Sequence, residues 1–513
     1  MGTFSHAFSL PIKNVHVYND NAKIVKEGVE MFRDATSMAQ AVRDKQVSPL
    51  ELVLETIEKA ERLNPRLNAI VSKRYEEAIE EAKQFRVSNN QPFAGVPLFL
   101  KDLGQEKKGT PCTYGSRLFK DYICQETSHF VKRLEELGFI ILGRTNTPEF
   151  GYKMVSDAQL HGSVRHFLDE TVNAGGSSGG AAAIVAAGVS PMSAASDGGG
   201  SIRVPASHNG LIGLKPTRGR VPVGPGSYRG WNGATVQFAL TKTVRDTRNL
   251  LWHLQTCQLE SPFPLPLLQK ENLFSPKLNR PLKVGMLLKH PIGGKVSSEV
   301  EQVVRQMAKK FELDGHEVSE IAEDPINGIE LQKGFYLISG AETVVMFQRM
   351  EKQLQRQMTR FDMELMTWVM YQSGLMVTGA DYARVAGDWD RYAEAMMQLH
   401  DTYDVLLLPT VANTAPKQDA YSLDADLIEK MEHIHELSHE ERQEVVWKMF
   451  ESSVEDTPFT QRMNITGQPA ISLPVGYSRE GMPIGVQLVA AKGREDLLLA
   501  IAEQWEEDEL WKF

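Results

Sequence analysis

One stretch of this chain consists almost entirely of small residues, and it limits what the chain can fold into. Between Ala174 and Ser201, eight residues are Gly, six are Ser and eight are Ala, so 22 of 28 side chains are small. Such a segment lets the backbone approach its neighbours closely, and a glycine-rich turn before a helix can gather several N–H donors at one point. The segment therefore predicts tight packing around a binding or catalytic loop.

The same region passes the simplest test for a membrane span. Thr171–Ser196 contains 26 consecutive residues without a charge, and about 20 apolar residues are enough to cross a bilayer. Its composition argues against that interpretation, because Gly, Ser and Ala gain too little free energy on transfer into lipid. We therefore expect no membrane partner.

Composition and charge exclude further classes of function. Lys and Arg number 56 against 66 Asp and Glu, which leaves a net charge of −10 without any long basic block, so we expect no nucleic-acid partner. The three cysteines lack CxxC spacing, which argues against a disulfide framework and fits a reducing compartment. The N-terminal sequence MGTFSHAFSLPIKN has no export or lipidation motif. We therefore predict a cytoplasmic protein.

The order of predicted elements indicates an α/β fold. Short apolar runs that are typical of buried strands alternate with amphipathic helices, as in proteins with a substantially parallel sheet. Strands are predicted at 93–100, 139–142, 282–288, 316–321, 405–408 and 470–475, with two helices over 34–64 and others at 130–138 and 297–313. No repeat or linker divides the chain. We therefore predict one large α/β/α domain over 1–513, with a mixed, mostly parallel central sheet covered by helices.

Residues 341–377 are predicted to be helical and contain seven methionines. Methionine is flexible, so it can fill irregular gaps in a core or line an adaptable pocket. We favour core filling for this segment.

Two glycine loops in the small-residue segment present hydroxyl groups. The first is GGSSGG at 175–180, and the second is DGGGS at 197–201, which places Ser201 directly after three glycines. N–H donors gathered by such loops suit either a phosphate or the oxyanion of acyl transfer. A P-loop needs Gly-x4-Gly-Lys-Ser/Thr, which is absent, whereas acyl transfer needs a hydroxyl nucleophile beside a base. The loops therefore favour acyl transfer.

A candidate base precedes these loops. Lys101 lies at the end of the predicted buried strand, next to Asp102. A lysine is a poor base near neutral pH unless burial favours its uncharged form. Neutral Lys101 could take the proton of Ser177 while Ser177 takes that of Ser201. Considered singly, Lys101 could instead form a surface ion pair with Asp102, and Ser177 could cap a helix.

Several separated blocks of the chain together resemble the amidase signature family. They are GVPLFLKD at 95–102, GRTNTPEFG at 143–151, GGSSGG at 175–180, DGGGSIRVPA at 197–206, GLKPTRGRV at 213–221, NITGQPA at 464–470 and GMPIGVQ at 481–487. The likeness runs from about residue 30 to the end. It implies the family's α/β/α fold, with a signature core at about 93–222 and a helical and βα region on the substrate side at about 282–416.

The resemblance implies a Ser–Ser–Lys triad. In it, Ser201 is the nucleophile, Ser177 is the middle serine and Lys101 is the base. The peptide bond between Gly176 and Ser177 is expected to be cis. Backbone N–H groups would form the oxyanion hole; these belong to Gly198, Gly199, Gly200 and Ser201. Other residues would support the site structurally, namely Asp197, Arg203, Gly176 and Ser178.

The implied activity is hydrolysis of carboxamide bonds through a covalent acyl-enzyme on Ser201, with release of a carboxylic acid and an amine or ammonia. The resemblance implies an amidase of the class that acts on linear amides, EC 3.5.1, with no metal and no cofactor. Its partner would be a small-molecule amide, and a homodimer is compatible with the family. Residues 403–416 and 459–504 resemble bacterial amidases of the 6-aminohexanoate cyclic-dimer hydrolase type.

The chain departs from the family pattern in two places. Gly198 occupies a position where the family usually has Thr, and His166-Phe167-Leu168 replaces the usual Asn-Pro-Trp. Neither departure touches the triad. We expect both to reshape the mouth of the pocket.

Three other functions remain open. Gly175–Gly179 matches the Gly-x-Ser-x-Gly pattern of α/β-hydrolases, with Ser177 as nucleophile. A glutamine-hydrolysing amidotransferase subunit for tRNA-dependent amidation uses the same triad, although its typical C-terminal GFGxEVKRR block is absent. The run His435-Glu436-Leu437-Ser438-His439 matches the HExxH motif of zinc proteases, which requires both histidines on one helical face.

Overall fold

A mixed β-sheet organises the described part of the chain, which comprises residues 34–275, 278 and 280–511 of the computed structural model. In these residues the larger sheet has eight strands in the order β4-β6-β5-β10-β11-β9-β7-β8, and a three-stranded sheet has the order β1-β3-β2. The strands are β1 Ile70–Lys73, β2 Pro97–Lys101, β3 Ile140–Thr145, β4 Met192–Asp197, β5 Ile212–Lys215, β6 Val236–Thr241, β7 Lys283–Met286, β8 Glu317–Glu320, β9 Val405–Pro409, β10 Ala470–Tyr477 and β11 Pro483–Ala490. The N-terminal part of the predicted domain and the targeting prediction, both on residues 1–33, lie outside the described residues.

The sheet is mixed, as predicted, but the expectation that it would be mostly parallel is wrong. Within the described strands, antiparallel pairing runs from β4 to β9, while β9, β7 and β8 pair in parallel. One physical reason is the short connection between β10 and β11. Strand β10 ends at Tyr477 and β11 begins at Pro483, so five residues connect them. A loop this short joins antiparallel neighbours, whereas a parallel pair needs a long crossover.

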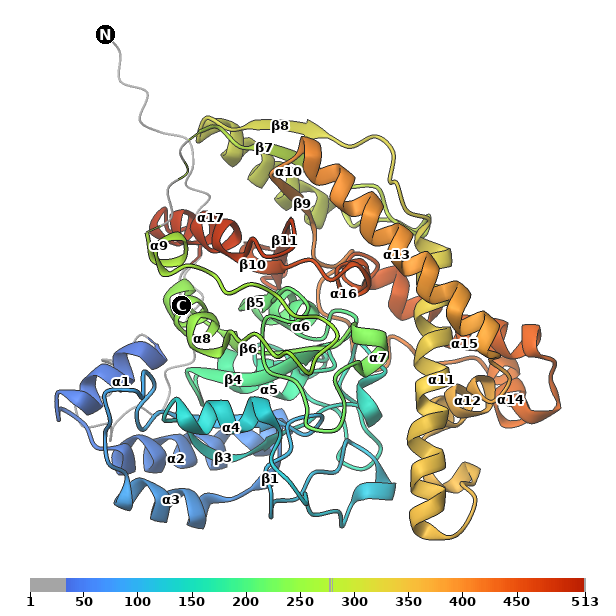
Figure 1. The fold of residues 1–513 in the computed structure, drawn as a ribbon, viewed down its shortest axis with the longest axis horizontal. Coiled ribbons are helices and arrows are strands. Elements are labelled where there is room, and N and C mark those ends of the chain that lie inside the picture. The colour runs from blue at the N-terminus through green and yellow to red at the C-terminus, as the bar shows by residue number, and fades with distance from the viewer. Residues whose placement is uncertain (1–33, 276–277, 279, 512–513) are drawn as a thin grey trace. The chain divides into compact units, whose positions relative to one another are not determined.

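Helices cover both faces of the larger sheet (Figure 1). Successive side chains of a strand point to opposite faces. Along β9, Val405 and Leu407 belong to one apolar cluster with residues of α10 and α17, whereas Leu406 and Leu408 belong to a second cluster with residues of α11, α15 and α16. The helices are α1 Ala35–Arg43, α2 Pro49–Leu67, α3 Tyr75–Gln84, α4 His129–Glu136, α5 Gly179–Ala186, α6 Arg203–Asn209, α7 Gly230–Gly233, α8 Val244–Leu254, α9 Lys270–Phe274, α10 Ser298–Leu313, α11 Gly328–Leu354, α12 Leu365–Gly374, α13 Gly379–Thr402, α14 Ala425–Glu432, α15 His439–Asp456, α16 Gln461–Thr466 and α17 Glu495–Glu507.

The small-residue segment forms α5 and β4, and both elements are buried. Every residue of α5 from Gly179 to Val185 is buried. A Cβ at Gly180 would lie 2.6 Å from the carbonyl oxygen of Ala69, so a larger residue would push the helix away from its neighbour. The predicted tight packing is confirmed at this helix.

The helix predicted over 341–377 is interrupted. Helix α11 ends at Leu354, Gln355 takes a left-handed conformation with φ 54°, and α12 begins only at Leu365. The methionines of residues 341–377 lie in different environments. Met358 and Met363 are buried in a small apolar cluster, while Met346 and Met350 are only partly buried beside it. Core filling is therefore confirmed for part of this set.

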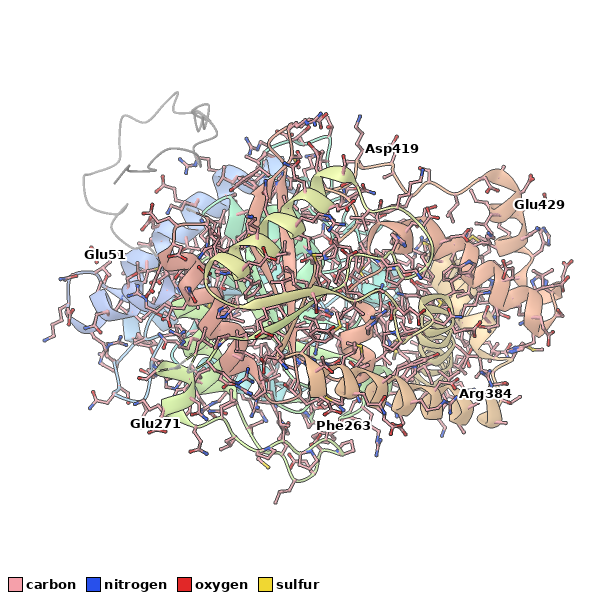
Figure 2. All side chains as sticks on the ribbon, turned by 90° about the horizontal axis from the view of Figure 1, so that it is seen from above. Glu51, Phe263, Glu271, Arg384, Asp419 and Glu429 are labelled. Atoms are coloured by element: carbon pink, nitrogen blue, oxygen red, sulfur yellow. The ribbon has the colours of Figure 1, made fainter. Side chains whose placement is uncertain are left out.

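Many charged side chains lie at the periphery of the described chain, although several others are buried. Figure 2 shows Glu51, Arg384 and Glu429 at its edge, and all three are exposed. Among the residues that the structure describes, none of the helices combines the length and the apolar character that a bilayer crossing requires.

The packing of α17 against α10 gives a test of the core. Trp505 is 1% exposed, and its ring centroid lies 5.1 Å from that of Phe311. We expect Trp505→Ala to lower the free energy of unfolding by about 3–5 kcal/mol, because the deletion leaves a cavity. Urea denaturation measures this loss. The control Leu259→Ala, at a residue that is 86% exposed, should change stability by less than about 0.5 kcal/mol; equal losses in the two variants would contradict the packing.

Candidate active site

The three residues predicted for catalysis meet where β2 and β4 end. Lys101 is the last residue of β2, and its Nζ donates hydrogen bonds to Oγ of Ser177 at 2.7 Å and to Oγ of Ser196 at 3.0 Å. Ser201 follows β4 and lines the same cavity as Ser177. The structure thus brings the predicted base, the middle serine and the nucleophile to one site.

Lys101 lies in a buried environment. Its side chain is fully buried, and this burial lowers the pKa of Lys101 to about 7, although the charge of Asp197 opposes the shift. Asp102 accepts a hydrogen bond from the backbone of Thr113 at 2.9 Å. The alternative of a surface ion pair between Lys101 and Asp102 is wrong, because neither side chain reaches the surface.

Ser177 is held by the loop that precedes α5. The Gly176–Ser177 peptide bond is cis, as the resemblance implied, and a Cβ at Gly176 would lie 2.7 Å from the backbone nitrogen of Val155. Ser178 occupies the N-cap position of α5, so the helix-cap interpretation of Ser177 is wrong. The hydroxyl of Ser178 donates to the carbonyl oxygen of Ser196 at 3.2 Å, which ties this loop to the end of β4.

The hydrolase-elbow interpretation of Ser177 does not hold either. That arrangement requires a histidine beside the serine. The side chain that contacts Ser177 Oγ is instead Lys101, and the serine is only 2% exposed.

A buried ion pair shapes the second glycine loop. Both Asp197 and Arg203 are fully buried, and two Arg203 nitrogens each lie 2.9 Å from a different oxygen of Asp197. Arg203 also donates to Thr460 O at 2.9 Å and to Gln487 Oε1 at 2.7 Å. Burial alone would raise the pKa of Asp197, but the charge and hydrogen bonds of Arg203 lower it to about 2. The pair therefore stays ionised and joins the loop to α16 and β11.

This pair changes the predicted set of oxyanion donors. The backbone N–H of Gly200 donates to Oδ1 of Asp197 at 2.8 Å, so Gly200 is not free to donate to an oxyanion in this arrangement. The prediction that Gly200 belongs to the oxyanion hole is therefore wrong. The N–H groups of Gly198, Gly199 and Ser201 remain as candidate donors.

A cavity of about 740 Å³ opens onto these residues. Its wall includes aromatic and methionine side chains, among them Phe119, Tyr122, Phe150, Tyr152, Trp231 and Met350. Its charged lining residues are Glu342, Arg229 and Arg349. The cavity can therefore hold a molecule with apolar parts beside the two serines.

The two departures from the family pattern differ in position. Gly198 lines the cavity, as expected. His166 is buried and its Nε2 lies 2.9 Å from the carbonyl oxygen of His208, and Phe167 and Leu168 are not among the residues that line the cavity. The expectation that His166-Phe167-Leu168 reshapes the mouth is therefore wrong.

The HExxH motif does not lie on one helix. His435 and Glu436 belong to a short 3-10 turn, Leu437 is extended, and Ser438 caps the start of α15 at His439. The helix begins inside the motif because Ser438 forms a capping box with Glu441. In the described part of the chain, His, Cys, Asp and Glu side chains form no group of three or more that could hold a metal ion. The zinc-protease alternative is therefore wrong.

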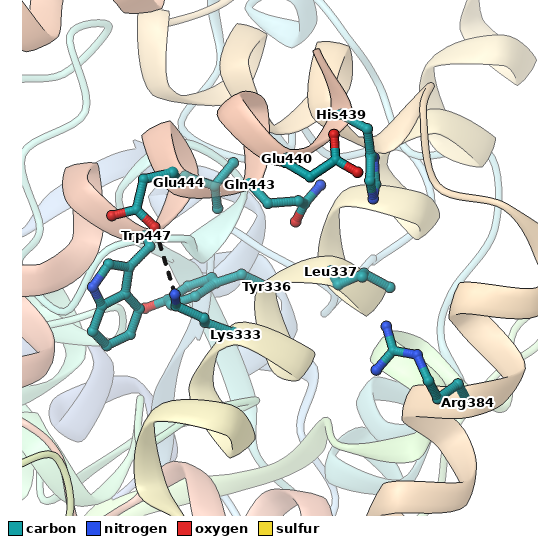
Figure 3. A pocket seen from close by; sticks show the side chains of 10 residues that line it. Lys333, Tyr336, Leu337, Arg384, His439, Glu440, Gln443, Glu444 and Trp447 are labelled. Carbon is teal, nitrogen blue, oxygen red and sulfur yellow. Dashed lines mark ion pairs between the residues drawn. The ribbon is translucent and has the colours of Figure 1, made fainter.

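His439 instead lines a second cavity of about 270 Å³ between α11, α13 and α15 (Figure 3). Lys333 and Glu444 form an ion pair across it, with 3.5 Å between Nζ and Oε2. Neither Ser177 nor Ser201 lines this cavity, so it is not the candidate active site.

Several residues of the site were not predicted. Ser196, which contacts Lys101 Nζ, could have been found, because it lies in the motif directly before Asp197 at a strand end. Tyr152, Trp231 and Glu342 line the cavity from segments that are far apart in the sequence. No local pattern marks these three residues.

Known proteins resemble this chain in sequence over most of its length. Residues 51–499 match the Amidase family model. A lipoamidase from Enterococcus faecalis is 36% identical over 477 residues, which cover 93% of this chain and 63% of the lipoamidase, so the chain spans less than two thirds of that relative. A 6-aminohexanoate-cyclic-dimer hydrolase from Paenarthrobacter ureafaciens is 33% identical over 487 residues, which cover 93% of this chain and 95% of the relative.

Solved structures share the fold. A structure of 6-aminohexanoate cyclic dimer hydrolase complexed with substrate superposes with a TM-score of 0.82 at 32% identity, covering 93% of this chain and 97% of that one. The fold is that of α/β proteins of the amidase signature class. The chain belongs to the amidase family, and the predicted family is confirmed.

The buried ion pair beneath the glycine loop makes a stability prediction. We expect Arg203→Met to lower the free energy of unfolding by about 3–5 kcal/mol, because it leaves the charge of Asp197 buried without a partner. The control is Arg305→Met, which removes an exposed pair with Glu301 and should lower stability by no more than about 1 kcal/mol. Urea denaturation of both variants measures the difference, and wild-type stability in Arg203→Met would contradict the role of the pair.

Proposed function

We propose that this chain hydrolyses carboxamides through a Ser–Ser–Lys triad and a covalent acyl-enzyme on Ser201. The observation that carries the proposal is the 2.7 Å contact between Lys101 Nζ and Ser177 Oγ, at a buried lysine beside a cavity that both Ser177 and Ser201 line. Membership of the amidase family supports the reaction class. The relatives named above are a lipoamidase and a cyclic-dimer hydrolase, and both names describe amide cleavage.

In the proposed acylation step, uncharged Lys101 accepts the proton of Ser177, and Ser177 accepts the proton of Ser201. The Ser201 oxygen then forms a bond to the carbonyl carbon of the amide. Backbone N–H groups of Gly198, Gly199 and Ser201 stabilise the negative charge that develops on the carbonyl oxygen, and one such donor typically contributes about 2.7–4 kcal/mol.

Collapse of this intermediate breaks the C–N bond. Ser177 donates its proton to the departing nitrogen and regains one from protonated Lys101, so an amine or ammonia leaves and Ser201 carries the acyl group. Protonation of the leaving nitrogen is essential for amides, since an amide anion is a very poor leaving group. Water then attacks the ester carbonyl, with the same groups moving its proton, and releases a carboxylic acid and free Ser201.

The nucleophile can be tested by substitution. We expect Ser201→Ala to lower kcat/KM for an aryl amide by more than about 10⁴-fold and to abolish labelling by a fluorophosphonate, because acylation has no acceptor oxygen. The matched control is Ser193→Ala, at a buried serine of β4 that donates to Phe99 O and should retain activity. Labelling of Ser201→Ala at the wild-type rate would contradict the assignment.

The same assay separates this function from the amidotransferase alternative. The isolated chain should cleave a simple aryl amide without a partner protein. Activity that requires glutamine and a partner complex would favour the amidotransferase subunit.

The base can be tested by pH. Because burial lowers the pKa of Lys101 to about 7, its uncharged form dominates above that pH. We expect kcat/KM for amides to rise with pH through about 7 and to level off above it. Lys101→Ala should cleave esters slowly and amides not at all, since esters do not need a protonated leaving group. Full amidase activity in Lys101→Ala, or a profile without the rise near 7, would contradict this role.

A further inference from the structure

Trp231 packs directly on Gly198, the first glycine of the second loop. A Cβ built on Gly198 would lie 2.6 Å from Cζ3 of Trp231 and 2.7 Å from Cε3, so the indole fills the space that any side chain at position 198 would need. Gly198, Trp231 and Ser201 all line the same cavity. The indole is therefore a wall beside the nucleophile.

The backbone that carries this indole is unusual. Trp231 and Asn232 both take left-handed conformations, with φ 47° and 49°, which residues with a Cβ keep only where the surroundings enforce them. The carboxylate of Glu342 on α11 accepts hydrogen bonds from both backbone N–H groups, at 2.7 Å from Trp231 and 2.6 Å from Asn232. Because charge-assisted bonds are stronger than neutral ones, Glu342 holds this turn in place.

Ring contacts fix the indole from other sides. Tyr152 stacks on it with 5.9 Å between centroids and 11° between planes, and Phe335 meets it edge to face at 5.5 Å and 89°. The hydroxyl of Tyr382 on α13 donates to Oε1 of Glu342 at 3.3 Å. Contacts from several separate segments thus fix the position of the Trp231 indole. The indole has little freedom to move away from Gly198.

We propose that Trp231, held against Gly198 by Glu342, is the specificity-determining wall of the active site, and that it restricts the enzyme to amides of acids that are unbranched next to the carbonyl. The inference rests on the proposed function. Gly198 supplies a candidate N–H donor to the carbonyl oxygen, so the indole on Gly198 lies beside the scissile carbonyl. A methyl branch on the adjacent carbon would meet the indole, whereas an unbranched chain can pass it.

The test compares two substrates that differ by one methyl group, hexanoyl-p-nitroanilide and 2-methylhexanoyl-p-nitroanilide. The measured quantity is the ratio of kcat/KM for the unbranched to the branched amide. One methyl group changes fit in a closed pocket by about 10–200-fold. The intrinsic reactivities of the two anilides do not depend on the enzyme variant, so a change in the ratio from one variant to another reports on the wall.

Two variants should lower this ratio. We expect Trp231→Ala to lower it by about tenfold or more, because the wall is removed, with Trp231→Phe falling between Trp231→Ala and wild type. Glu342→Gln should lower it by about threefold or more, because glutamine accepts only one of the two N–H bonds and the turn loosens. The control Glu330→Gln, at an exposed glutamate in the first turn of the same helix, should leave the ratio unchanged.

The ratio does not depend on how much of a variant is folded, because misfolded protein lowers the rate for both substrates equally. A wild-type ratio in Trp231→Ala, with hydrolysis that still requires Ser201, would overturn the inference and leave the proposed function intact. Failure of the wild-type chain to hydrolyse either anilide would instead overturn the proposed function, and this inference with it.

A double variant tests the contact itself. Gly198→Ala should lower kcat/KM for the unbranched anilide by about tenfold or more in the wild-type background, because the added Cβ displaces the indole. In the Trp231→Ala background the same change should lower kcat/KM by a clearly smaller factor, since two residues in contact do not act additively. Equal losses in both backgrounds would overturn the proposed contact.

Discussion

Asp197 and Arg203 form a buried ion pair on which the geometry of the site depends. Asp197 ends β4 and accepts the backbone N–H of Gly200, while Arg203 begins α6 and donates to Thr460 and Gln487. The glycine loop between the two charged residues is therefore tied to the central sheet and to α16. Two fully buried charges are tolerated only if each is well paired, so breaking these contacts to rearrange the loop would be costly.

The same pair influences the candidate base. Asp197 favours the charged form of Lys101, whereas burial favours the uncharged form, and burial prevails. Arg203 keeps Asp197 ionised, so the negative charge near Lys101 is constant across the physiological range. Burial thus lowers the pKa of Lys101 more than the charge of Asp197 raises it, and the pKa lies near neutral. The surrounding Gly and Ala residues of α5 and β4 provide the close packing that buries the side chain.

The sequence was informative where the relevant residues are neighbours along the chain. The two serine loops, the buried strand that ends at Lys101 and the supporting roles of Asp197 and Arg203 all follow from short motifs, and the structure brings these residues together. Strand direction was not predictable in this way, because it depends on which distant strands pair. The HExxH pattern misled for a local reason: Ser438 inside it is a better helix cap than a helix interior residue.

The cavity wall could not be read from the sequence because its parts come from separate regions. Tyr152 follows β3, Trp231 lies in α7, and Glu342 lies on α11. The left-handed backbone at Trp231 has no sequence signal of its own, since glycine or asparagine is the usual residue in that conformation. Its explanation is the carboxylate of Glu342, more than 100 residues later in the chain.

Chemistry and specificity therefore have different physical origins in this fold. The reacting groups are fixed by a buried ion pair and by close packing of small residues, and these demands leave little room for change. The wall is fixed by a turn, an acidic side chain and packed rings, which approach the glycine loop at Gly198 through Trp231 and at Gly199 through Phe335. A substitution in the wall can change which amide fits without disturbing Lys101 or Ser177. Relatives at 33–36% identity are named a lipoamidase and a 6-aminohexanoate-cyclic-dimer hydrolase, and the fold superposes on a structure of the latter with a TM-score of 0.82.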